Sequence, residues 1–135
     1  MPDIPAVVER DGQGRKMANI LIVDDAIFMR QSLKRALEAH GHIVCGEAGD
    51  GREAIAKFAE LKPDVTILDI TMPEMSGLDA LKHIKAIDPD AKIVICSAMG
   101  QQAQLAQAIQ YGAQDFIVKP FQEERMIAAI EKVLG

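Results

Sequence analysis

Aromatic side chains are scarce in this sequence of 135 residues, which has no Trp, one Tyr and four Phe. A core with so few rings has to be built from aliphatic side chains, and little surface is left for stacking on single-stranded nucleic acid. The net charge of -5 also argues against a surface that is basic throughout, as in many nucleic-acid-binding domains. We therefore expect no nucleic acid among the partners.

Long apolar runs are missing as well. No stretch reaches the ~18 consecutive apolar residues of a membrane span, and residues 1–16 contain no apolar segment typical of a secretory signal. The two cysteines, Cys45 and Cys96, lie singly within apolar runs and lack the spacing of metal ligands. We expect both to be buried as small apolar groups. Together these features predict a cytoplasmic protein without membrane insertion.

The composition that remains is that of a folded domain, with 49% hydrophobic and 26% charged residues. The length fits one domain and leaves no room for an appended output domain of ordinary size. Residues 1–18 lack periodicity and contain two prolines and two glycines, which predicts a flexible tail. The domain itself is expected over residues 19–135.

From residue 19 onward, short apolar runs alternate with segments of helical periodicity. The expected strands are Asn19–Asp24, Ile43–Glu47, Asp64–Ile70, Ala91–Ala98 and Ala113–Val118. The expected helices are Ala26–His40, Gly51–Leu61, Ser76–Ile87, Gln101–Tyr111 and Phe121–Leu134. Nearly continuous apolar strands that alternate with helices predict an α/β fold, a five-stranded parallel sheet doubly wound by five helices.

Polar residues follow the carboxyl ends of these strands, the edge where doubly wound sheets bind ligands. Asp24 and Asp25 end the first strand, Asp69 lies near the end of the third, Ser97 near the end of the fourth, and Lys119 follows the fifth. Each residue alone has an ordinary explanation, such as a helix cap for an aspartate or a solvated lysine. Their joint arrangement favours a functional site.

The chemistry of this set is specific. Three crowded carboxylates repel one another, so a proton or a cation must be present among them, and carboxylates are ligands that Mg²⁺ prefers. A carboxylate can also attack a phosphoryl group to form an aspartyl phosphate. We interpret Asp69 as the nucleophile and Asp24 and Asp25 as Mg²⁺ ligands. Lys119 and Ser97 then supply the ammonium and hydroxyl that an anionic phosphoryl group needs.

Four segments resemble the receiver domain of bacterial response regulators: Val23–Asp25 (VDD), Leu68–Gly77 (LDITMPEMSG), Ser97–Ala98 and Lys119–Phe121 (KPF). The resemblance extends over residues 19–135 and implies a flavodoxin-like sheet with the strand order 2-1-3-4-5. It is strongest to the stand-alone chemotaxis regulators of that family, through Cys96–Ala103 and Phe116–Gln122.

The resemblance implies a role for each site residue. Asp69 is the phosphoacceptor, and Mg²⁺ is bound by Asp24, Asp25, Asp69 and the backbone carbonyl of Thr71. Such a domain is a signalling switch rather than an enzyme, with only weak self-phosphorylation and self-dephosphorylation.

Three further residues belong to the implied switch. Lys119 pairs with the phosphoryl group, Ser97 is the switch hydroxyl, and Phe116 is the switch aromatic, at a position where many relatives have Tyr. Pro120 resembles a family proline that follows a cis peptide bond.

The implied partners are a histidine kinase of a chemotaxis pathway, a flagellar motor switch protein and a phosphatase. Helix Gln101–Tyr111 has no charged residue, whereas DNA-binding relatives dimerise through charged pairs on this helix. We therefore expect a monomer whose uncharged helix contributes to a partner surface.

Two alternative functions stay open at this stage. The chain could serve a phosphorelay or a two-component pathway outside motility, or it could be a metal-dependent phosphatase that acts on a separate substrate. The three histidines, His40, His42 and His83, share no helical face with carboxylates and are expected at the surface.

Overall fold

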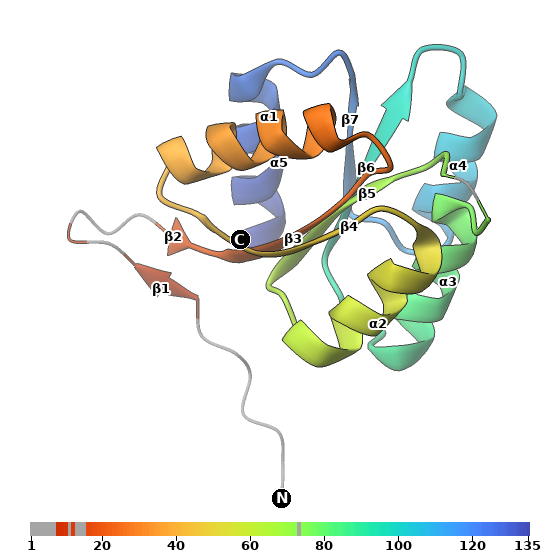
Figure 1. Cartoon of the computed structure of the whole chain (residues 1–135), viewed down its shortest axis with the longest axis horizontal. Helices are drawn as coiled ribbons and strands as arrows, with labels where there is room; N and C mark the ends of the chain where they lie inside the picture. Colours follow the sequence, from red (N-terminus) through yellow and green to blue (C-terminus); the bar gives the residue numbers. More distant parts are fainter. Residues whose placement is uncertain (1–7, 11, 13–15, 73) are drawn as a thin grey trace, which may run out of the picture.

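The computed structural model describes residues 8–10, 12, 16–72 and 74–135 (Figure 1). The expected tail over residues 1–18 falls largely outside these ranges. Its described part forms two short antiparallel strands, β1 (Glu9–Arg10) and β2 (Lys16–Met17). Val8 packs against the hydrophobic core, and Ala18 is fully buried.

The central sheet consists of five parallel strands: β3 (Asn19–Val23), β4 (Ile43–Ala48), β5 (Val65–Asp69), β6 (Ile93–Ala98) and β7 (Asp115–Lys119). Their order in space is β4-β3-β5-β6-β7. Counted from β3 as the first strand, this is the expected order 2-1-3-4-5. Both the expected fold class and the expected strand order are therefore confirmed. The middle strand β5 is buried along its whole length, so its β-branched and apolar residues serve both faces of the sheet.

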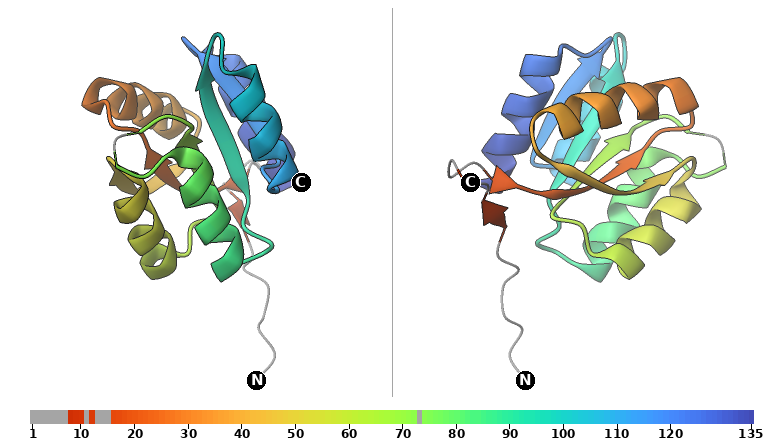
Figure 2. Two further views of the ribbon diagram at one scale, coloured as in Figure 1. Left: turned by 90° about the vertical axis from the view of Figure 1, so that its right-hand side faces the viewer. Right: turned by 60° about the vertical axis from the view of Figure 1, so that its left-hand side comes forward.

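Five helices cover the sheet: α1 (Ile27–Ala39), α2 (Gly51–Leu61), α3 (Gly77–Ile87), α4 (Gln102–Gln110) and α5 (Glu123–Leu134). Helices α1 and α5 lie on one face, and α2, α3 and α4 lie on the other (Figure 2). Each face has its own aliphatic core cluster. Among the described residues, no helix combines the length and apolarity that crossing a bilayer requires.

Gly77 at the start of α3 allows this helix to approach the end of β5 closely. A Cβ atom at this position would lie 2.0 Å from the backbone oxygen of Asp69, a distance that no side chain tolerates. The helix is capped by Ser76, whose hydroxyl accepts a hydrogen bond of 3.2 Å from the Asp79 amide. The first turn of α3 is therefore packed directly against the end of β5.

Burial differs from expectation at two positions. His42 is buried, so its expected surface position is wrong: its Nδ1 accepts a hydrogen bond of 3.1 Å from the Ala18 amide, and burial lowers its pKa. Cys96 is buried as expected, but Cys45 is only half-buried. Cys45 lies on the edge strand β4 at a shift in the pairing register, where one side of the strand has no neighbouring strand.

Candidate functional site

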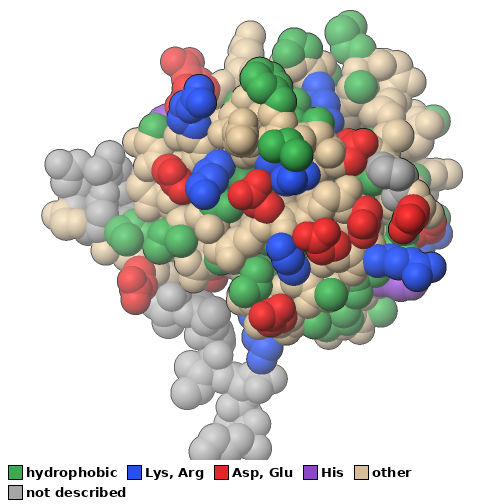
Figure 3. Space-filling view, viewed as in Figure 1, with side chains coloured by type: hydrophobic (Ala, Val, Ile, Leu, Met, Phe, Trp, Pro, Cys, Tyr) green, Lys and Arg blue, Asp and Glu red, His purple; other side chains and the backbone are tan. Residues whose placement is uncertain are grey.

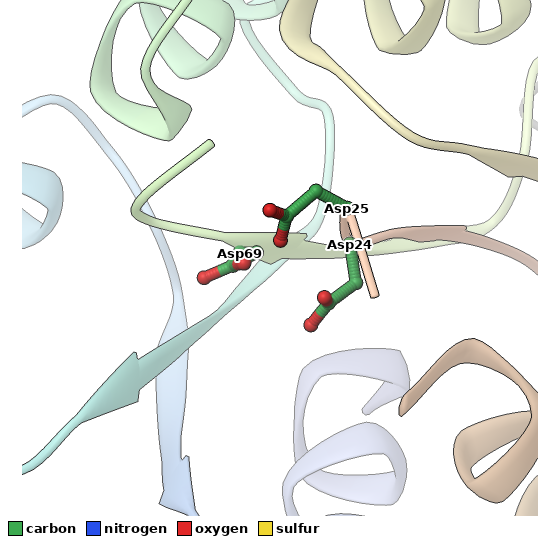
Figure 4. A group of neighbouring side chains, drawn as sticks. All are labelled: Asp24, Asp25 and Asp69. Atoms are coloured by element: carbon green, nitrogen blue, oxygen red, sulfur yellow. The ribbon is translucent and has the colours of Figure 1, made fainter. Parts of the chain in front are cut away.

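The three predicted carboxylates meet at the carboxyl edge of the sheet (Figure 4). Asp24 and Asp25 follow β3, and Asp69 is the last residue of β5, which pairs with β3. One carboxylate oxygen of each lies within 4.8 Å of the others. Asp24 and Asp69 are buried, whereas Asp25 is exposed, so the cluster opens toward solvent on the Asp25 side.

Asp24 is held by several contacts. Its Oδ1 accepts a hydrogen bond of 2.9 Å from the Ala26 amide, and its own amide donates one of 3.0 Å to the Ala48 oxygen. Its Oδ2 lies 2.8 Å from the Lys119 Nζ atom. A buried carboxylate requires such partners because burial alone penalises its charge. Asp24 therefore has a fixed position before any ligand arrives.

Lys119 bridges two of the carboxylates. It ends β7, and its Nζ atom lies 2.8 Å from Asp24 Oδ2 and 3.3 Å from Asp69 Oδ2. Burial alone would lower the pKa of Lys119, but the hydrogen bond to Asp24 and the negative charges of Asp69 and Asp24 raise it above its ordinary value. The ammonium therefore stays charged at neutral pH. The peptide bond between Lys119 and Pro120 is cis, as the resemblance implied.

Asp69 is the carboxylate with the most altered acidity. Burial and the neighbouring charge of Asp24 raise its pKa to about 6, while Lys119 and the amide of Thr71, 3.3 Å from Oδ1, act in the opposite direction. A carboxyl group with this pKa is mostly ionised at neutral pH. It is also more basic than an exposed aspartate, so an added cation or electrophile would relieve its repulsion with Asp24.

The donor set fits a hard divalent cation. One carboxylate oxygen of each aspartate lies within 4.8 Å of the others, and the charge of Asp24 disfavours ionisation of Asp69, the other buried member. Magnesium selects oxygen ligands of this kind and keeps several waters, for which the exposed Asp25 side leaves room.

Ser97 and Phe116 lie on the neighbouring strands rather than within the carboxylate cluster. Ser97 is buried and follows Cys96, the residue of β6 that pairs with Asp69. Phe116 lies half-buried on β7 and packs against the core on the α4 side of the sheet. The guanidinium of Arg125 lies 5.8 Å from the centre of its ring.

Gln101 makes a contact between two loops of the site that the sequence did not indicate. Its side-chain oxygen accepts a hydrogen bond of 2.6 Å from the Ala98 amide, and its amide group donates to the Thr71 hydroxyl. The loop before α4 is thereby joined to the loop after Asp69. A glutamine at a helix start has no distinctive sequence pattern, so this contact could be found only in three dimensions.

The face of the molecule seen in Figure 1 carries side chains of both charges. Figure 3 shows acidic and basic side chains interspersed over the face that carries α1, α2 and β4.

Comparison with known proteins places these features in context. The family model described as "Response regulator receiver domain" matches residues 20–131. The chemotaxis protein CheY of Thermotoga maritima is 60% identical over 114 residues, which cover 84% of this chain and 95% of that protein. The chemotaxis protein CheY of Bacillus subtilis is 56% identical over 116 residues, covering 86% of this chain and 97% of that protein.

Solved structures share the fold. The CheX-CheY-BeF3-Mg complex of Borrelia burgdorferi contains a chain that is 32% identical, with a TM-score of 0.84 over 91% of this chain and 92% of that chain. The response regulator domain of Thermotoga maritima CheB is 34% identical, with a TM-score of 0.81 over 88% of this chain and 97% of that chain.

Proposed function

This chain belongs to the response regulator receiver domain family and is closely related to chemotaxis regulators, and from that premise we propose that it is a phosphorylation switch. A histidine kinase of a chemotaxis pathway donates a phosphoryl group to Asp69. The phosphorylated form then binds a flagellar motor switch protein, and a phosphatase returns it to the resting state. The names of the relatives, and the neighbouring complex of CheX with CheY, support these partner classes.

One observation carries the proposal. Lys119 lies between Asp24 and Asp69, at 2.8 and 3.3 Å, beside a cluster of three carboxylates. A lysine in this position neutralises part of the cluster at rest, and it is already next to the oxygen that would receive a phosphoryl group. A simple structural ion pair would not require the third carboxylate, Asp25, on the exposed side.

The transfer step follows from the position of Asp69. One of its carboxylate oxygens attacks the phosphorus of a phosphohistidine, the P–N bond breaks, and the bonding electron pair leaves with the imidazole nitrogen, which takes up a proton. The product is a mixed anhydride on Asp69. The ionised state of Asp69, which predominates at neutral pH, is the nucleophilic one.

Asp24, Asp25, Asp69 and the backbone carbonyl of Thr71 are the groups we assign to Mg²⁺. When bound, the cation supplies positive charge to the phosphoryl oxygens. Lys119 supplies a second positive charge from the end of β7, an edge strand of the same sheet. Its ammonium can exchange the oxygen of Asp69 for a phosphoryl oxygen while keeping its contact with Asp24.

The response to phosphorylation involves the next two strands. The Ser97 hydroxyl donates a hydrogen bond to a phosphoryl oxygen, and its movement changes the space beside Phe116 on β7. Phe116 and the α4 helix thereby shift between two packings whose populations phosphorylation biases. The half-buried position of Phe116 against the α4 side of the core supports this route.

The direct test uses acetyl phosphate with Mg²⁺ and measures the gain of one phosphoryl group by intact-protein mass spectrometry. We expect Asp69→Asn to abolish uptake and Asp90→Asn, an exposed position in the loop before β6, to match the wild type. Uptake by Asp69→Asn at the rate of the wild type would contradict the proposal.

A second measurement separates the switch from a phosphatase that acts on other substrates. We expect no sustained hydrolysis of small phosphoesters, because the acceptor is consumed in each cycle and dephosphorylates slowly. Catalytic turnover of such esters would favour the phosphatase.

A third measurement distinguishes a motility output from another two-component pathway. We expect the beryllofluoride-treated chain to bind a motor switch protein and the untreated chain to lose this binding.

A further inference from the structure

We propose that Arg30 is a positioning residue that sets the orientation of the two metal-binding aspartates at the end of β3. This inference rests on the proposed function, because it concerns the acidic site that is assigned to Mg²⁺. The Nη1 atom of Arg30 donates a hydrogen bond of 2.7 Å to the backbone oxygen of Asp24. Arg30 therefore acts on the backbone between the two aspartates rather than on a carboxylate.

The guanidinium of Arg30 is fixed by two hydrogen bonds, one to the Asp24 backbone and one to Glu47. The Nε atom of Arg30 donates a hydrogen bond of 3.0 Å to Oε1 of Glu47 on β4, and the Arg30 side chain is only 17% exposed. A guanidinium has a planar fork of donors, so anchoring one nitrogen on Glu47 fixes the direction of the other. Arg30 belongs to α1, and it joins this helix, β4 and the end of β3.

The peptide plane explains how this contact reaches Asp25. The oxygen of Asp24 belongs to the same rigid peptide unit as the amide of Asp25. Fixing that oxygen limits the rotation of the unit that carries Asp25 out of the strand. Asp25 is the exposed member of the cluster and lies just beyond the end of β3. Core packing therefore restrains it less than the two buried aspartates, and a fixed backbone matters most for its orientation.

Asp24 itself is held at each of its polar groups. Its amide is bound to Ala48, its carboxylate to Ala26 and Lys119, and its carbonyl to Arg30. Of these, the Arg30 contact is the one that comes from a charged side chain to the backbone, and it can be removed without altering a carboxylate. Hydrogen bonds from residues behind metal ligands commonly contribute tenfold or more to metal affinity.

The test compares four proteins: the wild type, Arg30→Met, Arg30→Lys and Arg35→Met. Arg35 is exposed on the same helix, so its replacement by Met is the matched control. Calorimetric titration with Mg²⁺ is expected to show about a tenfold loss of affinity for Arg30→Met. Arg30→Lys, which keeps the charge but lacks the fork, is expected to lose affinity to a smaller degree. Arg35→Met is expected to stay within about twofold of the wild type.

Two further readouts separate positioning from a general loss of stability. In the metal-free protein, the ¹⁵N amide resonance of Asp25 is expected to move in Arg30→Met, because it reports on the hydrogen bond to the preceding carbonyl. In phosphorylation by acetyl phosphate, the Mg²⁺ concentration for half-maximal rate is expected to rise about tenfold. The rate at saturating Mg²⁺ is expected to change by less than about twofold. A merely structural role would lower the unfolding midpoint and leave these values unchanged.

The outcomes are distinct. Wild-type Mg²⁺ affinity in both Arg30 variants would overturn this inference and leave the proposed function intact. A wild-type protein that binds no Mg²⁺ would overturn the metal assignment in the proposed function, and this inference with it. Should Arg30→Met not fold, Arg30→Lys decides by the same criteria, because it keeps the charge and most of the apolar stem.

Discussion

The two helices that flank the acidic site, α1 and α4, are attached to the molecule to very different degrees. Helix α1 buries Leu33, Ala36 and Leu37 in the core and contacts the backbone of Asp24 through Arg30. Within the described part of the chain, α4 has one fully buried residue, Ala108, and its start is joined to the site through Gln101. Local stability follows such burial, so α4 should open at a lower free energy than α1.

The difference has a functional meaning. In the proposed function, groups that hold a cation must keep their geometry, and two of them, Asp24 and Asp25, lie next to the firmly packed helix α1. A surface that has to change when the chain is phosphorylated needs two packings of similar energy, and a lightly packed helix provides them at a small cost. We therefore propose that the α1 side holds the metal and the phosphoryl group in place, and that the α4 side changes its packing and binds the partner.

The largest test of this comparison is a pair of leucine truncations. Leu37 on α1 is fully buried, and we expect Leu37→Ala to lower the free energy of unfolding by about 2–5 kcal/mol. Leu105 on α4 is only half-buried, so Leu105→Ala should cost about 1 kcal/mol. Urea unfolding measures both. Equal losses would show that the two helices are held alike.

The second test concerns the electrostatic repulsion within the acidic site, between Asp69 at the end of β5 and Asp24. The pKa of Asp69 is raised from 3.8 to about 6, so the folded state favours its protonated form. Its contribution to stability is therefore fully present below pH 3.8 and is lost as the pH rises through about 6. The loss amounts to about 3 kcal/mol between these limits.

Asp69→Asn should remove that loss. Without divalent metal, we expect this variant to be more stable than the wild type at pH 7, and the advantage should shrink toward pH 4. Thermal unfolding of the two proteins over this pH range measures the difference, in which titrating groups that do not interact with Asp69 cancel. An advantage that does not depend on pH would show that the pKa of Asp69 is ordinary.

The smallest test weakens the connection of α4 to the site. Gln101→Ala removes the hydrogen bonds to Ala98 and Thr71, with a cost of about 1 kcal/mol. We expect amide hydrogen exchange in α4 to accelerate several-fold while exchange in α1 stays unchanged. Gln104→Ala, an exposed position on the same helix, is the matched control. Equal acceleration in both helices would contradict a local role for Gln101.

Much of the fold was accessible from the sequence. Every strand and helix of residues 19–135 was expected within two residues of its observed bounds, because apolar runs and helical periodicity alternate clearly. The cluster of Asp24, Asp25 and Asp69 with Lys119 followed from one rule, that parallel strands end at one edge of the sheet. Their closeness in space is confirmed, while their roles in phosphoryl transfer stay predictions.

The remaining features depend on contacts that have no sequence pattern. His42 was expected at the surface because it shares no helical face with carboxylates, yet it accepts a hydrogen bond from the buried amide of Ala18. Arg30 binds the Asp24 carbonyl and also Glu47 on β4. Gln101 binds the Ala98 amide and also Thr71, 30 residues away. Either side chain would be ordinary on a solvated helix. The contacts of such side chains can be identified only once the ends of β3, β5 and β6 are placed beside one another.

The absence of charge from α4 has a consequence for how partners arrive. A partner that contacts this helix gains no long-range attraction from it, so its association rate should depend little on ionic strength. In the proposed function, the phosphodonor instead approaches three carboxylates and an ammonium, whose combined field is screened by salt. Salt concentration should therefore change the rate at which the phosphodonor associates far more than the rate at which a partner binds to α4.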